Sequence, residues 1–178
     1  MFFAFAVFTG LYLKFGFTPY YFIYGVFSAC LIMSGIIDLK VHILPNIINA
    51  AGLAAAFIIS VARGVNTPGP GPVWDFLSGG AACGVPMLLI SVISKRGVGM
   101  GDVKFAALIG AFLGVLGGLC ALWLSIVLGG VFSAVLIAAG KATRKSYIPF
   151  GPFMVIGALI MVFFGDFIKT FLSAAYHV

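Results

Sequence analysis

Seven apolar stretches, separated by short polar or glycine- and proline-rich segments, dominate the pattern of this sequence. Each stretch is continuously apolar and does not alternate with polar residues, which favours helices over the strands of a membrane barrel. A helix needs about 20 apolar residues to cross the hydrocarbon core of a bilayer. The expected helices cover approximately residues 1–13, 18–38, 44–62, 74–94, 102–117, 118–140 and 149–171.

The lengths of these stretches set the expected number of spans at six or seven. The region 102–140 is too long for one span at a rise of 1.5 Å per residue, so we place a break near Gly117 and Gly118. The stretch "NTPGPGP" is not expected to be helical. Together the segments predict one membrane-embedded all-α domain over residues 1–178, in which residues 1–17 need not cross the bilayer.

The composition agrees with a polytopic helical membrane protein. Hydrophobic residues make up 63% of the chain and charged residues only 8%, which is too little to cover a surface that faces water. The formal net charge is +6, but the basic residues lie singly or in small clusters between apolar segments. No basic face results, so a nucleic-acid partner is not expected. The start, Met1-Phe2-Phe3, has no basic flank and is interpreted as an uncleaved segment.

The basic residues predict an orientation. Seven of the ten fall on one side of the expected bundle: Lys40, Lys95, Arg96, Lys104, Lys141, Arg144 and Lys145. The opposite side holds the other three: Lys14, Arg63 and Lys169. Loops rich in lysine and arginine remain in the cytoplasm. We therefore expect the first side to be cytoplasmic.

The sequence contains no glutamate and only four aspartates. Ionisable groups at membrane depth are costly, and each is therefore a functional candidate. Counting spans places Asp38 and Asp102 at the cytoplasmic ends of their helices and places Asp75 and Asp166 at the opposite ends. Asp166 precedes Lys169 by three residues, which suits an ion pair within one helix. Asp75 begins a helix, where the dipole favours a negative charge, so structural roles explain both.

Structural roles explain Asp38 and Asp102 less well. Asp102 opens a helix and could cap it, but Asp38 ends one, where the dipole disfavours an anion. An interfacial ion pair with a lysine is the alternative for Asp38.

Two carboxyls in a restricted site do not easily both ionise, so one keeps a proton. The ionised member can deprotonate an attacking water while the other protonates the carbonyl oxygen and then the leaving amine; the sequence does not assign the base.

The residues around this pair suit a peptide substrate. Glycine occupies alternate positions before Asp102, at Gly97, Gly99 and Gly101. Glycine lets backbone approach closely and adopt positive φ, so an extended peptide could reach the carboxyl. Lys40 and Lys104 each follow an aspartate by two residues and point away from it on a helix. They are candidates for shaping the site or binding substrate, and anchoring to membrane phospholipid is the alternative.

Other kinds of site have less support. "GVGMG" lacks the G-x-G-x-x-G spacing and follows no strand, so a nucleotide site is not expected. His42 has no second ligand spaced nearby, and interfacial polarity explains it better than a metal. The cysteines, Cys30, Cys83 and Cys120, lie singly in apolar runs and are interpreted as buried thiols. We expect neither a metal nor a cofactor.

Three motifs, in order, resemble those of a known family. The segment "IIDLKVHILPN" resembles the first aspartate motif of the type IV prepilin peptidases, a group of membrane aspartic proteases. "GMGDVK" resembles their G-x-G-D motif, and "YIPFGPFMVIGAL" resembles the Pro-Phe-Gly-Pro opening of their last helix. The resemblance covers roughly residues 20–165. G-x-G-D alone is a weak pattern, whereas the ordered combination in an all-helical membrane chain is specific.

This resemblance implies that Asp38 and Asp102 are the catalytic pair of a membrane aspartic endopeptidase. Pro45 and Asn46 are expected to shape the turn after Asp38. Pro149, Gly151 and Pro152 are expected to shape the start of the last helix as structural residues, and a contribution to the site is the alternative. The implied substrate is a prepilin-like precursor (a pilin, pseudopilin or preflagellin) with a basic leader and an apolar helix. Cleavage is expected at the cytoplasmic face of the cytoplasmic (inner) membrane.

One departure and two alternatives accompany this resemblance. Larger bacterial members carry an N-terminal cytoplasmic domain with paired C-x-x-C motifs that methylates the new N-terminus. This sequence lacks such cysteines, so a peptidase-only form is expected and methyltransferase activity is not. A small transporter or channel with acids lining a polar path is one alternative, and a non-catalytic pilus assembly factor is the other. The oligomeric state does not follow from the sequence.

Overall fold

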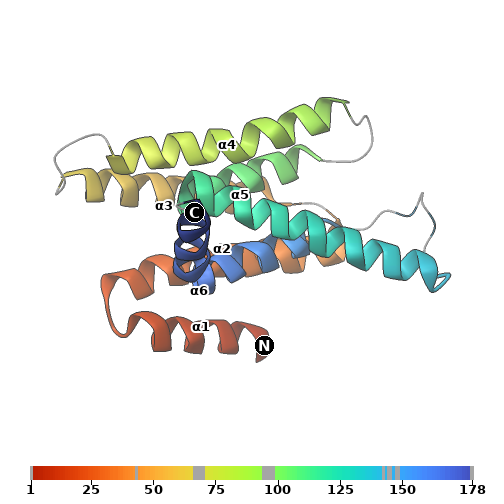
Figure 1. Ribbon diagram of the computed structural model, residues 1–178, viewed down its shortest axis with the longest axis horizontal. Helices are drawn as coiled ribbons and strands as arrows, with labels where there is room; N and C mark the ends of the chain where they lie inside the picture. Colours follow the sequence, from red (N-terminus) through yellow and green to blue (C-terminus); the bar gives the residue numbers. More distant parts are fainter. Residues whose placement is uncertain are drawn as a thin grey trace.

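The computed structural model describes residues 2–42, 44–65, 71–93, 99–141, 143, 146 and 149–176. Within these residues the chain forms six helices and no strand (Figure 1). The helices are α1 (Phe2–Phe15), α2 (Pro19–Val41), α3 (Asn46–Val65), α4 (Gly71–Ile93), α5 (Met100–Ala138) and α6 (Gly151–Tyr176). The all-α bundle expected from the sequence is confirmed.

Helices α2, α4, α5 and α6 are long and apolar enough to cross a membrane, and α1 and α3 are apolar but shorter. The chain is therefore an integral membrane protein with a helical bundle. One expected boundary is wrong. Residues 66–70 of the proline-rich stretch lie outside the described part, but Gly71 and Pro72 already belong to α4, because proline is well tolerated in the first turn of a helix.

Helix α5 consists of two rods that run in opposite directions (Figure 1). The reversal lies at Gly114, with φ 75° and ψ 179°, a conformation that is essentially restricted to glycine. The expected break in residues 102–140 therefore exists, three residues before Gly117. With α5 counted as two rods, the described part of the chain contains seven rods, in agreement with the seven expected segments.

Gly118, near which the break was expected, serves close packing instead. A Cβ atom there would lie 2.6 Å from Cys83 Sγ in α4 and 2.7 Å from Gly110 Cα in the first rod of α5. Lipid tails are as apolar as the side chains, so close van der Waals packing between small residues holds membrane helices together. Gly118 thus joins the two rods of α5 to α4, whereas Gly114 makes the turn.

The rods alternate in direction, so the bundle has two ends (Figure 1). At the end on the right of Figure 1, which we name the Asp38 end, α2 and α4 finish and α5 and α6 begin. At the left-hand end, named the Asp75 end, α4 begins and α5 reverses. The first rod of α5 lies in the centre: Phe105, Ala106, Leu108 and Ile109 are fully buried. The core therefore fixes the helix that carries Asp102.

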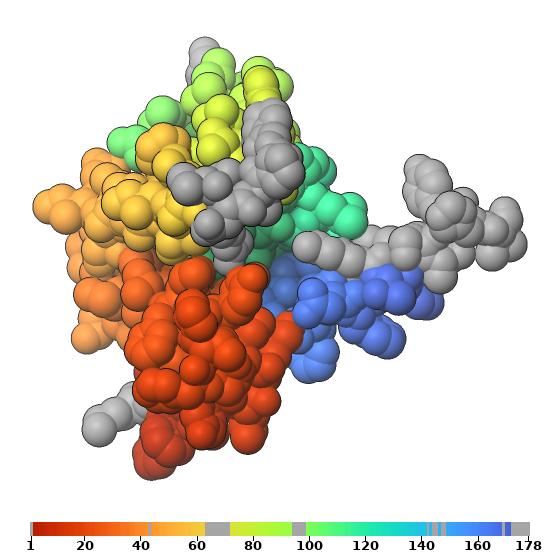
Figure 2. Space-filling view, turned by 90° about the vertical axis from the view of Figure 1, so that its left-hand side faces the viewer, coloured from red at the N-terminus to blue at the C-terminus, as the bar shows by residue number. Residues whose placement is uncertain are grey.

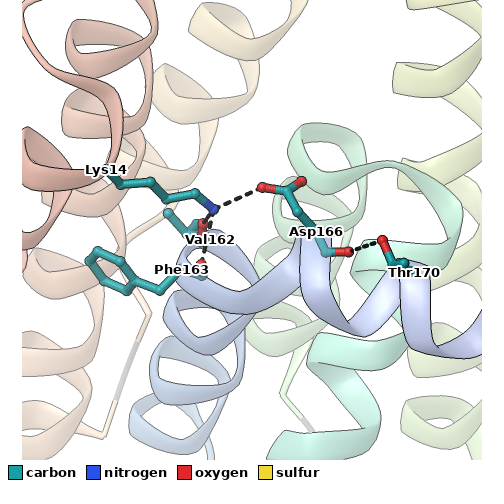
Figure 3. Close-up of polar contacts among 5 residues, drawn as sticks. All are labelled: Lys14, Val162, Phe163, Asp166 and Thr170. Atoms are coloured by element: carbon teal, nitrogen blue, oxygen red, sulfur yellow. Dashed lines mark hydrogen bonds and ion pairs between the residues drawn. The ribbon is translucent and has the colours of Figure 1, made fainter.

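Helix α6 bends near Phe163, and Lys14 of α1 lies at the bend (Figure 3). Lys14 Nζ donates to the carbonyl oxygens of Val162 and Phe163 at 2.9 Å each and forms an ion pair with Asp166 at 3.0 Å. A side chain that bonds to the backbone ladder is a recognised cause of a sharp helix bend. Beyond the bend, the part of α6 that is drawn in blue projects sideways from the bundle in Figure 2.

Candidate active site

Asp38 lies in the last turn of α2 and is 3% exposed. The helix ends at His42, whose φ of 54° is left-handed and whose N–H donates to the Asp38 carbonyl oxygen at 2.9 Å. This geometry turns the chain sharply away from the helix axis. The turn brings the following Leu44 and Asn46 beside the Asp38 carboxyl, in one pocket with it.

Asp102 lies at the start of α5 and is 8% exposed. Its Oδ2 accepts a hydrogen bond from the N–H of Gly99 at 3.0 Å, and its own N–H donates to the Gly99 carbonyl oxygen at 3.0 Å. The sequence suggested that Asp102 could cap the helix. The structure shows that Gly99 occupies the capping position and that Asp102 reaches back to it from the third helical residue, as in a capping box.

A third helix contacts the Asp38 carboxyl. The N–H of Gly151, at the start of α6, donates to Asp38 Oδ2 at 3.0 Å. The Pro149–Pro152 segment, interpreted from the sequence as structural, therefore also contributes a backbone group to the site. Each of the two carboxyls has one oxygen bound to a backbone N–H, and none of the described residues donates a hydrogen bond to the other oxygen.

Asp38 and Asp102 line one open pocket of about 260 Å³ at the Asp38 end. The two carboxyls are close enough to interact electrostatically, and His42 interacts electrostatically with Asp38. The lining residues are Asp38, His42, Leu44, Asn46, Gly99, Met100, Gly101, Asp102 and Lys104. The two aspartates, 64 positions apart in the sequence (102 − 38), are thus brought together by the fold.

Four of the six residues expected to shape the site line this pocket: Asn46, Gly99, Gly101 and Lys104. Lys104 Nζ donates to Asn46 Oδ1 at 2.9 Å and so links α5 to α3. Lys40 is exposed and lies outside the lining, as does Pro45, whose carbonyl oxygen accepts the N–H of Asn49 at 3.2 Å. Pro45 thus lies in the turn that follows Asp38 and helps to begin α3, and a role of Lys40 towards the substrate remains a prediction.

Gly101 has a more specific role than conformational freedom. A Cβ atom on Gly101 would lie 3.0 Å from Leu44 Cβ, so the missing side chain lets the segment after α2 pack against α5. This close approach helps to bring Asp38 and Asp102 into one pocket. Gly97, the first of the alternating glycines, lies outside the described residues.

Sequence reasoning missed three residues of the pocket, His42, Leu44 and Met100, and it named Gly151 without its bond to Asp38. His42, Leu44 and Met100 lie within four residues of a candidate, so proximity in the chain was a usable signal. Gly151 is 113 positions from Asp38, and no local spacing could reveal that bond.

The other two aspartates lie at the Asp75 end, as expected from the span count. Asp75 lines a pocket of about 270 Å³ with Ser60 and Gly114, and Asp166 lines another of about 360 Å³ with Lys14. The expected ion pair between Asp166 and Lys169 involves a side chain outside the described part, whereas Lys14 is a partner in the structure (Figure 3). The two pairs of acids therefore lie at opposite ends of the bundle.

The described residues contain no group of three or more His, Cys, Asp or Glu side chains that could hold a metal ion. Two carboxyls can act as acid and base towards a water molecule and a carbonyl group. Their backbone N–H partners orient them without using the second oxygen of either group.

Comparisons with known proteins agree with the motifs. Residues 25–134, which include both aspartates of the pocket, match the type IV leader peptidase family. A prepilin leader peptidase/N-methyltransferase of Bacillus subtilis (strain 168) is 31% identical over 165 residues, which are 89% of this chain and 62% of the relative. A protein of the same description from Pseudomonas putida is 32% identical over 137 residues, covering 76% of this chain and 47% of the relative.

A shorter match of 72 residues to a protein of that description from Aeromonas salmonicida reaches 38% identity and covers 40% of this chain and 25% of the relative. The chain thus spans less than two thirds of the length of these three relatives. No solved structure matches. Because the family match covers more than half of the 178 residues and contains both aspartate motifs, the chain belongs to the type IV leader peptidase family.

Proposed function

We propose that this protein is a membrane aspartic endopeptidase that cleaves the leader peptide from prepilin-like precursors. The observation that carries the proposal is the pocket at the Asp38 end, where Asp38 and Asp102 come together in a chain of this family. The names of the relatives join two activities, a leader peptidase and an N-methyltransferase, and the proposal concerns the peptidase activity.

The pair supplies the groups that hydrolysis of a peptide bond requires. The ionised carboxyl takes a proton from a water molecule, and the water oxygen attacks the scissile carbonyl carbon. The carbonyl electron pair moves to its oxygen, which accepts the proton of the second carboxyl. On collapse of the tetrahedral intermediate, one hydroxyl returns its proton to the second carboxyl and re-forms the carbonyl. The C–N bond breaks as the first carboxyl passes the proton that it took from water to the leaving amine. Both side chains are largely buried, at 3% and 8% exposure, and they meet the substrate and the attacking water in the pocket that they line.

The other residues of the pocket shape the approach of the substrate. Gly99 presents backbone without a side chain beside Asp102, so an extended peptide can lie close to the carboxyl. Lys104 and Asn46, joined by their hydrogen bond, border the pocket between α5 and α3. Lys40 is exposed on α2, and we assign it to the membrane interface, where lysine contacts phospholipid headgroups.

The basic loops support a cytoplasmic location for the Asp38 end. A precursor would keep its basic leader in the cytoplasm and its apolar helix in the bilayer, so that the junction between them lies at the level of the pocket. Binding of the helix alongside the bundle would hold the scissile bond near the two carboxyls and lower the entropic cost of reaction.

The test is incubation of the purified protein, in detergent or in liposomes, with a prepilin-like precursor. Mass spectrometry then identifies the new N-terminus. We expect cleavage at the junction of the basic leader and the apolar helix by the wild type, and cleavage about 10²–10⁴-fold slower by the Asp38→Asn variant. An intact precursor after incubation with the folded wild type would contradict the proposal and leave the transporter and assembly-factor hypotheses.

A further inference from the structure

The first turn of α6 has a single N–H group that its own helix does not use. Helices begin with backbone donors that lack a partner within the helix. In α6, the N–H groups of Phe153 and Met154 donate to the Phe150 carbonyl oxygen at 3.1 and 3.2 Å, and Pro152 has no N–H group. Gly151 therefore holds the remaining donor of this turn.

That donor is directed at Asp38. The N–H of Gly151 lies 3.0 Å from Asp38 Oδ2 in a buried hydrogen bond. A Cβ atom at Gly151 would lie 2.6 Å from the same oxygen and 3.0 Å from Cγ of Asp38. Only glycine therefore allows the carboxyl to reach this N–H. The helix dipole of α6 adds a favourable interaction with a negative charge at this position.

Asp38 needs such a partner more than Asp102 does. Asp102 starts its own helix and binds the N–H of Gly99 three residues before it. Asp38 stands in the last turn of α2, where its own helix offers carbonyl oxygens and no free donors. Asp102 thus binds a backbone N–H at the start of its own helix, whereas Asp38 binds a backbone N–H at the start of α6, far away in the sequence. Both carboxyls consequently have Oδ2 bound and Oδ1 without a donor among the described residues.

We propose that Gly151 is a positioning residue of the active site. Its N–H binds Oδ2 of Asp38, so that Oδ1 is left to act on the attacking water or the scissile peptide bond. The inference rests on the proposed peptidase function and extends it to a third helix. Pro152 contributes by removing a competing donor, and the absent side chain of Gly151 provides the space for the carboxyl. The Pro-Phe-Gly-Pro segment is thus part of the site and not only the start of a helix.

The hydrogen bond can be observed without any activity. The sequence contains three Phe-Gly pairs, at Gly16, Gly151 and Gly165, so labelling phenylalanine with ¹³C at the carbonyl and glycine with ¹⁵N yields three selected amide signals. We expect the Gly151 proton signal to move upfield in Asp38→Ala, because its charged acceptor is lost, and the other two signals to move less. An unchanged Gly151 signal would overturn the proposal.

The kinetic test removes the donor without adding an atom. Replacing Gly151 by glycolic acid, through nonsense suppression, converts the amide to an ester. The N–H is replaced by an oxygen, and the Phe150 carbonyl oxygen becomes a weaker acceptor for Phe153 and Met154. We expect kcat for precursor cleavage to fall about 10-fold or more, with KM unchanged, since the precursor helix binds elsewhere. Gly151→Ala should lower kcat about 100-fold or more by displacing the carboxyl. Gly130→Ala, at a position with nothing within 4 Å of the added Cβ, is the matched control.

The outcomes separate the two proposals. If the wild type cleaves and Asp38→Asn does not, but the ester variant has the kcat of the wild type, the positioning role of Gly151 is wrong and the peptidase function stands. If the wild type does not cleave, the peptidase function fails, while the amide signal still decides whether Gly151 binds Asp38. A higher KM with an unchanged kcat in the ester variant would also contradict positioning, because the N–H would then serve substrate binding.

Discussion

Each end of the bundle carries two aspartates, but the environments of the two pairs differ. At the Asp38 end, Asp38 and Asp102 are buried, share one pocket and each bind a backbone N–H. At the Asp75 end, Asp75 is exposed, and Asp166 has an 85% exposed side chain whose charge is met by Lys14. The same residue type therefore stands in two environments within one chain.

The difference in environment supports the proposal that Asp38 and Asp102, and not Asp75 and Asp166, carry the chemistry. A carboxyl paired with a lysine at the surface is neutralised and available to water. A carboxyl that is buried beside a second carboxyl is electrostatically costly, and such arrangements occur where chemistry uses them. Backbone donors at helix starts make the arrangement tolerable at the Asp38 end.

The largest expected effect comes from neutralising single acids. Asp38→Asn or Asp102→Asn should lower the rate of precursor cleavage about 10²–10⁴-fold, because each removes a general acid or base. Asp75→Asn and Asp166→Asn should leave the rate near that of the wild type. The measurement is cleavage of a prepilin-like precursor by the four purified variants. Comparable losses from acids at both ends would favour a polar path through the bundle over a local active site.

The grouping of the acids could be predicted from the sequence, but their partners could not. Counting apolar segments separates Asp38 and Asp102 from Asp75 and Asp166, because each span reverses the side. The interactions of Asp38 with Gly151, of Lys104 with Asn46 and of Asp166 with Lys14 join residues far apart in the chain. Such bonds depend on how the rods pack, which no local pattern contains.

The position of the break in α5 shows the same limit. Gly114, Gly117 and Gly118 lie within five residues, and each could have made the turn. Packing determines which glycine makes the turn. Gly118 packs against Cys83 and the first rod, and the chain reverses at Gly114. Sequence patterns predict that a break is needed, while tertiary contacts select the glycine.

A smaller effect is expected at this reversal, and it should concern stability. Gly114→Ala forces a side chain into a conformation with φ 75° and should lower the free energy of unfolding by about 1–3 kcal/mol. Denaturation in SDS, followed by circular dichroism, measures the change against Gly130→Ala. Cleavage per folded molecule should be retained, because Gly114 lies at the Asp75 end. An unfolding transition equal to that of the wild type would contradict this prediction, because the alanine side chain would then cause no strain at position 114.

The smallest effect is expected at the bend of α6. Lys14→Met deletes two hydrogen bonds and an ion pair and should lower the free energy of unfolding by about 1–2 kcal/mol. Asp166→Asn should have a smaller effect, because an exposed partner contributes little. Thermal unfolding in the same detergent compares the two variants. A loss of cleavage in folded Lys14→Met would show that the two ends are coupled.

The central claim is that Asp38 and Asp102 act as one catalytic unit. The most direct test is the residual cleavage rate of the Asp38→Asn/Asp102→Asn double variant under single-turnover conditions. Residues that act as a unit have strongly non-additive effects. We therefore predict that the double variant cleaves about as slowly as the slower single variant. A loss equal to the product of the two single losses would contradict the claim, because the two acids would then contribute independently.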